Sequence, residues 1–208
     1  MKQSFRVLTG LLLIFVFCGG LHAKSRIGEY YLGFGYSLVD GDKSLQSMDG
    51  DVLSFFASSP QDTGADWRIH LNYGKYDFGP GKGDDSAWDL GIDYILYYDG
   101  HVEQNGIFRP YLGFGVDYMS NARGLLLDDN GFNWNFTVGT ELLFTDELSM
   151  YIGGSFYGMW SDFGENDWAW DIALTWWIDD VHGLSLDYQR PAEKDVNFIG
   201  LKYLYSWQ

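Results

Sequence analysis

Charged residues stand inside several stretches of the chain that otherwise hold apolar or small side chains. One group combines carboxylates with arginine and lysine and could form ion pairs: Glu29, Arg68, Arg109, Glu141 and Lys202. A second group is purely acidic and could attract cations: Asp89, Asp117 and Asp171. Buried charges must be paired and hydrogen-bonded, so the first group predicts an ion-pair network if the fold brings it into one interior.

Side chains suited to catalysis or to metal binding are sparse. Beyond residue 23 the chain has histidines only at three separate places: His70, His101 and His182. The segment 40–44 begins like a calcium loop, but Leu45 stands where such a loop requires glycine. No Ser-His-acid set is evident. We therefore expect no catalytic residues, no cofactor, no metal site and no enzymatic activity.

The elements that must position the charged residues show a period of two. Between Glu29 and Val39, every second residue from Tyr30 to Leu38 is large and apolar. Such alternation predicts a β-strand, because successive side chains point to opposite faces. The pattern recurs and predicts ten strands, with the weakest alternation in the second and the ninth. Their ranges are 28–39, 51–58, 66–78, 86–98, 107–119, 131–144, 147–160, 168–178, 183–189 and 195–205.

The two faces of these strands favour a single closed antiparallel transmembrane β-barrel, all-β, with about ten strands and eight as the alternative. One face is continuously apolar and rich in aromatic residues, which make up 19% of the chain, as the lipid-facing side of a barrel requires. The other face has few lysines and many glycines, which would let a narrow barrel close around a crowded interior. An exported soluble sandwich, with its apolar face turned inward, is the competing architecture.

The first residues predict export. Lys2 and Arg6 precede an apolar run from Leu8 to Cys18, and the segment 21–23 fits a cleavage site. We thus divide the chain into a signal peptide, 1–23, and an outer-membrane barrel domain, 24–208. The only cysteine, Cys18, falls within this signal, so the mature chain would form no disulfide and no Cys-type zinc site. Removing two positive charges takes the formal net charge from −16 to −18, which argues against nucleic-acid binding.

An even number of strands places both termini on the periplasmic side, with short turns there and longer loops outside. With this topology, the mixed charge group should lie in the periplasmic half of the lumen and the three aspartates in its outer half. Outward-facing aromatic residues fall near both strand ends and predict two girdles. The outer girdle would include Phe78, Trp88, Trp134 and Trp168.

Three motifs carry a family resemblance. The segment 109–118 reads RPYLGFGVDY, the segment 138–146 reads VGTELLFTD, and the segment 198–205 reads FIGLKYLY. In these motifs the chain resembles the opacity-type and related small outer-membrane β-barrels, which implies their fold and location. The family usually ends on an aromatic residue that the assembly machinery reads, whereas Trp207 is penultimate here. Ten strands also resemble the omptin proteases, but Asp84-Asp85 and the 180–182 segment would lie at opposite barrel ends and could not share a substrate.

These observations predict a bacterial outer-membrane protein with a structural or surface-interaction role and a lumen filled by side chains. The first alternative is a narrow cation-preferring channel, because the outer half of the lumen is acidic. The second is a barrel enzyme acting on lipid or peptide. The expected partners are outer-membrane lipid, lipopolysaccharide and the barrel-assembly machinery. The sequence does not predict an oligomeric state or a target for the loops.

Overall fold

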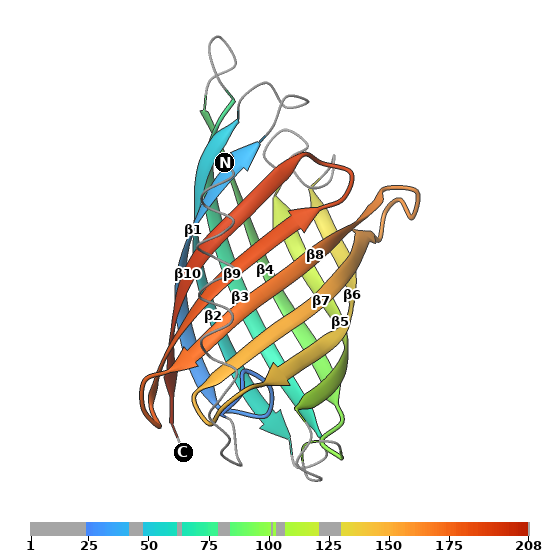
Figure 1. Ribbon diagram of the computed structural model, residues 1–208. Coiled ribbons are helices and arrows are strands. Elements are labelled where there is room, and N and C mark those ends of the chain that lie inside the picture. The colour runs from blue at the N-terminus through green and yellow to red at the C-terminus, as the bar shows by residue number, and fades with distance from the viewer. Residues whose placement is uncertain are drawn as a thin grey trace, which may run out of the picture.

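The chain folds into a closed barrel of ten antiparallel strands (Figure 1), which confirms the predicted all-β class. The computed structural model describes residues 24–41, 48–61, 64–78, 84–100, 102, 107–120 and 130–207. The proposed signal peptide, 1–23, lies outside them. The strands are β1 (Tyr31–Gly41), β2 (Asp49–Gln61), β3 (Ala65–Asp77), β4 (Asp84–Tyr97), β5 (Phe108–Ser120), β6 (Gly131–Leu143), β7 (Leu148–Met159), β8 (Asn166–Trp177), β9 (His182–Pro191) and β10 (Val196–Ser206).

Every strand pairs with its neighbours in sequence, and β1 pairs with β10 to close the sheet. The closing register runs from Tyr31 opposite Ser206 to Gly41 opposite Val196. Closure leaves no unpaired strand edge, so all strands satisfy their backbone hydrogen bonds within the barrel. Among the described residues, no helix is long and apolar enough to cross a membrane.

The predicted alternation of faces is present in the structure. In β1, the side chains of Leu32, Phe34 and Leu38 point outward and are exposed, whereas Tyr31 and Val39 are buried in the interior. The same outward face continues around the barrel through large apolar side chains of every strand. Because side chains alternate along a strand, one face of the sheet forms the exterior and the other fills the lumen.

The two barrel ends differ. The end where β1 begins and β10 ends will be called the turn end, because it holds the tight β6–β7 and β8–β9 connections at 144–147 and 178–181. The opposite end, with the β1–β2, β3–β4 and β5–β6 connections, will be called the loop end. In Figure 1 the turn end lies below and the loop end above.

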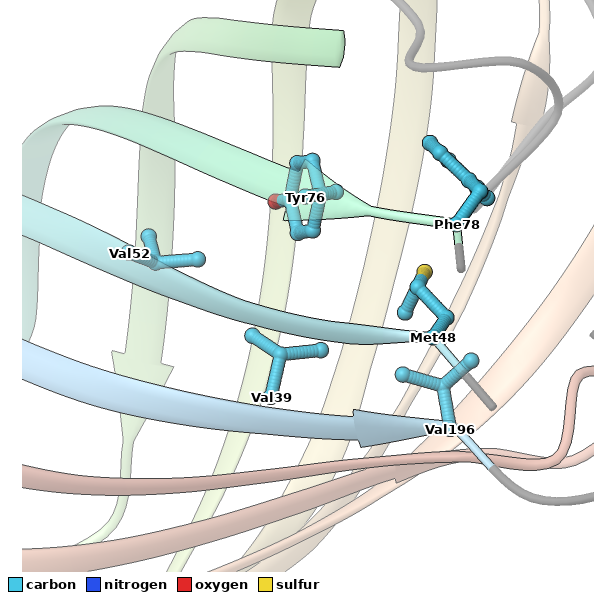
Figure 2. Packing of buried hydrophobic residues seen from close by; sticks show 6 residues of the cluster. All are labelled: Val39, Met48, Val52, Tyr76, Phe78 and Val196. Atoms are coloured by element: carbon cyan, nitrogen blue, oxygen red, sulfur yellow. The ribbon is translucent and has the colours of Figure 1, made fainter. Parts of the chain in front are cut away.

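Inside the loop end, a cluster of buried apolar side chains joins β1, β2, β3 and β10 (Figure 2). It consists of Val39, Met48, Val52, Tyr76, Phe78 and Val196. Phe78 was expected in the outer girdle, and this prediction was wrong: its side chain is only 5% exposed and packs within this cluster. Phe78 has the same parity as the inward Tyr76, so the alternation of β3 itself points its side chain into the lumen.

The strand bounds differ from the predicted ranges by up to three residues. β1 begins at Tyr31 rather than at residue 28, and β2 and β9 are longer than the weak alternation indicated. The residues before β1 do not extend the sheet. Gly28 instead adopts a φ of +83°, a left-handed conformation that glycine adopts without strain, and this turns the preceding segment away from the sheet.

Candidate functional site

The segment Lys24–Glu29, here called the N-terminal segment, lies inside the turn end of the barrel. Ser25 and Ile27 are each only 1% exposed. The Ile27 side chain packs in a buried cluster with Ile95 and Tyr111, whose side chains project inward from β4 and β5. An apolar anchor therefore holds the segment within the lumen.

Glu141 of β6 forms the main polar anchor of this segment. Its carboxylate accepts hydrogen bonds from the Ser25 hydroxyl and, at 2.9 Å, from the Arg26 backbone N–H. The Ser149 hydroxyl donates to it from β7, also at 2.9 Å, and Arg109 Nη1 lies 3.7 Å away. Glu141 is fully buried, so these donors replace the water that the carboxylate loses.

Further contacts hold the rest of the segment. The Gly28 N–H donates to Asp66 Oδ2 at 2.9 Å, and the Arg26 guanidinium pairs with Asp187 at 3.2 Å. Two arginines donate hydrogen bonds to backbone carbonyl groups of the N-terminal segment. Arg68 donates to the Arg26 carbonyl at 3.0 Å, and Arg109 donates to the Ile27 carbonyl at 2.8 Å. Side chains of β3, β5, β6 and β9 therefore all bind the N-terminal segment.

The predicted mixed charge group gathers at this end, but mostly with other partners. Within that group, the structure pairs Arg109 with Glu141. Lys202 instead pairs with Asp187 at 2.6 Å, and Arg68 lies 3.6 Å from Asp66. Glu29 belongs to the N-terminal segment rather than to a strand. Burial raises the pKa of Glu29, and the positive charges of Lys24 and Arg109 oppose that increase.

A second polar cluster lies farther along the lumen, around His70 of β3. His70 Nε2 lies 3.2 Å from Asp89 Oδ1 and 3.3 Å from Asp117 Oδ1, and Nδ1 lies 3.3 Å from Asp93 Oδ2. The structure therefore brings Asp89 and Asp117 together through one imidazole. Asp171 is not part of this cluster; it accepts a hydrogen bond from Ser155 at 2.9 Å.

The backbone register explains why these side chains meet. His70 pairs with Gly91, and Gly91 pairs with Asp117 on the next strand. A Cβ atom on Gly91 would lie 1.8 Å from Asp117 Oδ1 and 2.5 Å from His70 Cε1. The missing side chain thus leaves the space in which the imidazole and the carboxylate approach each other.

The lumen contains a cavity of about 410 Å³ that extends from the N-terminal segment past the His70 cluster to loop-end residues such as Val52 and Tyr76. Its lining includes Arg26, Tyr31, His70, Asp117, Asp171 and Lys202. Charged and polar groups from both clusters therefore face one internal space, and the N-terminal segment borders that space at the turn end.

Sequence reasoning missed several residues of both clusters. Asp66, Asp93 and His70 occupy inward positions of the alternation, so the same pattern could have assigned them. Asp187 lies on β9, whose alternation is weak. The sequence pattern did not indicate Arg26, because the N-terminal segment has no strand periodicity and its position depends on contacts with several strands distant in sequence.

Comparisons with known proteins indicate the fold alone. No protein-family model matches the chain, and no curated protein matches it. The chain is similar to the solved structure of an outer-membrane channel from Pseudomonas putida F1, with 8% identity and a TM-score of 0.57, covering 92% of this chain and 100% of that one. It is also similar to the translocator domain of the autotransporter NalP from Neisseria meningitidis, with 9% identity, a TM-score of 0.48 and coverage of 100% and 95%. The resemblance to the opacity-type barrels remains a prediction.

Proposed function

We propose that the protein is an integral outer-membrane β-barrel with a structural or surface-interaction role, whose lumen is closed at the turn end by its own N-terminal segment. The observation that carries the closed lumen is the burial of Ser25 and Ile27 in a segment that Glu141, Asp66 and Asp187 bind through hydrogen bonds and an ion pair. A segment held by both ion pairs and apolar packing does not leave the lumen without breaking several buried contacts. The turn end would face the periplasm and the loop end the outside.

The exterior supports the membrane location. Leu90 and Ile92 of β4 are 49% and 45% exposed, and comparable apolar side chains surround the barrel. Soluble proteins rarely expose apolar patches larger than a few hundred Å², so this surface fits lipid better than water. Outer-membrane lipid, lipopolysaccharide and the barrel-assembly machinery are the partners that this proposal requires. It includes no enzymatic activity.

A narrow cation-preferring channel is the second candidate, favoured by the cavity and by the carboxylates that line it. Asp89, Asp117 and Asp171 would favour cations over anions if water connected the cavity with both barrel ends. The two candidates differ in one property: whether the N-terminal segment stays in place under an applied voltage.

Conductance across a planar bilayer tests the proposal. The chain lacking residues 1–23 would be refolded in detergent, and its heat-shifted gel mobility would show that it has folded. We expect the intact chain to give no reproducible steps, and deletion of residues 25–28 to give steps with cation selectivity. The exposed pair of Arg190 and Asp195 offers a control, since Asp195→Asn should leave conductance unchanged. Reproducible steps from the intact chain would overturn the closed lumen and support the channel.

A further inference from the structure

We infer that the His70 cluster is a binding site for one divalent transition-metal ion of the zinc type. Its ligands would be His70, Asp93 and Asp117, and Asp89 would orient the imidazole. The proposal does not depend on whether the lumen conducts.

The first argument is the arrangement of donor atoms. One ligand atom from each of His70, Asp93 and Asp117 lies within 4.8 Å of the others. In a tetrahedral zinc site with bonds of about 2.0–2.1 Å, two ligand atoms lie about 3.3–3.4 Å apart. His70 Nδ1 and Asp93 Oδ2 already have this spacing, at 3.3 Å. Asp117 completes the set from the adjacent strand β5.

The second argument is a shortage of hydrogen-bond donors. A neutral imidazole has one N–H, yet both ring nitrogens face carboxylates. Without a proton or a cation, one nitrogen would direct its lone pair at a carboxylate oxygen. Asp117 Oδ1 is also buried and has no hydrogen-bond partner among the described residues. That oxygen lies 3.3 Å from Nε2, and a metal ion bound within the cluster would supply the positive charge that the carboxylates and an unprotonated ring nitrogen lack.

The third argument is charge. Asp89, Asp93 and Asp117 bring three carboxylates to one imidazole, which even when fully protonated carries a single positive charge. A divalent ion bound to two of these carboxylates would neutralise both. Arg68 also acts on Asp93 electrostatically, but its guanidinium already pairs with Asp66 and donates to the Arg26 carbonyl.

Neighbouring side chains hold the ligands as a metal site requires. A metal-bound histidine usually donates its other ring N–H to a carboxylate, and Asp89 Oδ1 lies 3.2 Å from Nε2 for that role. Asn72 donates to Asp89 at 2.9 Å. Asn135 donates to Asp93 at 3.0 Å and to Asp117 at 2.9 Å, so it links the two carboxylate ligands.

Glycines provide the space in which the ligand side chains converge. Besides Gly91, Gly115 on β5 pairs with Asp93, and a Cβ atom there would lie 2.0 Å from Asp93 Oδ1. Any larger residue at these two positions would occupy the space in which the carboxylates converge. The site also borders the 410 Å³ cavity, where water could complete the coordination. A mixed nitrogen and oxygen donor set fits zinc and its first-row neighbours better than magnesium or calcium.

Calorimetric titration with Zn²⁺ tests the proposal. The chain lacking residues 1–23, refolded in detergent and stripped with a chelator, should bind one Zn²⁺ with saturation. His70→Asn should weaken that binding by about 100-fold or more, and Asp89→Asn by about 10- to 100-fold, as expected when an orienting carboxylate is lost. Titration with Co²⁺ gives an independent readout, because a tetrahedral site produces strong visible absorption that His70→Asn should abolish.

The controls separate this site from other acidic groups. His182 lies in the β8–β9 region, where it contacts Tyr203, so His182→Asn should bind Zn²⁺ like the parent chain. Asp117→Asn keeps the shape of the side chain and serves if His70→Asn fails to fold, as judged by gel mobility. Absence of saturable binding, or binding that His70→Asn and Asp117→Asn leave unchanged, would overturn the proposal. The latter result would locate the ion on carboxylates elsewhere in the chain.

Discussion

Glu141 is the residue on which most contacts of the N-terminal segment depend. Its carboxylate joins that segment to β5 and β7 in a position without solvent exposure. Replacing Glu141 by glutamine would remove the negative charge that Arg109 pairs with. It would also place an amide NH2, which cannot accept a hydrogen bond, among groups that donate hydrogen bonds. We predict that Glu141→Gln lowers the free energy of unfolding by about 3 kcal/mol, measured by urea titration in detergent.

An exposed ion pair provides the comparison. Asp195 lies 3.5 Å from Arg190, and both side chains are about half exposed. Solvent screens such pairs, so Asp195→Asn should change stability by less than about 1 kcal/mol. Equal losses in the two variants would show that Glu141 acts as a surface charge rather than as a buried anchor.

Gly153 of β7 makes room for a buried tyrosine. A Cβ atom there would lie 1.9 Å from the Tyr111 hydroxyl and 2.9 Å from the Val138 carbonyl oxygen. Tyr111 has little freedom to retreat, because it stacks on Tyr151 with ring centroids 4.5 Å apart and packs against Ile27. We predict that Gly153→Ala costs about 1–3 kcal/mol of stability in urea titration, whereas Gly164→Ala in the β7–β8 connection costs less. If Gly153→Ala left the free energy of unfolding unchanged, the lumen would be loosely packed around Tyr111.

At the scale of elements, the β8–β9 turn depends on one carboxylate. Asp179 accepts hydrogen bonds from the Val181 N–H at 2.8 Å and the His182 N–H at 2.7 Å, and these donors lower its pKa. A lowered pKa in the folded state means that the stabilisation is present above the unfolded pKa and is lost as the pH falls through the folded value. The stability difference between the parent chain and Asp179→Ala should therefore shrink as the pH drops below about 4.

Asp179→Asn separates charge from hydrogen bonding in this turn. The amide oxygen still accepts from the backbone, so this variant should keep part of the stability and lose its pH dependence. If the difference between the parent chain and Asp179→Ala stayed constant between about pH 7 and pH 3, the carboxylate would not be responsible for the turn.

The elements also show what the sequence could predict. Strands such as β4 and β8 have strict alternation, so their existence and their inward face followed from a period of two. That pattern depends on neighbours within one strand. Contacts such as those of Ser25 with Glu141, 116 positions away, depend on the closure of the whole barrel. For the same reason, His70 could be placed on the inward face, but its three carboxylate neighbours come from the register of β3, β4 and β5.

At the scale of the whole molecule, the exterior decides between lipid and water as the surrounding solvent. Ile92 lies within β4 and is 45% exposed, whereas Tyr98 follows the turn end of β4 and is 59% exposed. In a bilayer, an outward arginine costs about 2–4 kcal/mol near the midplane and only about 0–1 kcal/mol near the interface. We predict this difference between Ile92→Arg and Tyr98→Arg, measured by unfolding from lipid vesicles. In water both variants would expose a charge on an already exposed position, so equal and small effects would contradict a membrane-spanning exterior. A large loss confined to Ile92→Arg would support it, because a gradient of cost with depth arises only where the surrounding medium changes from apolar to aqueous.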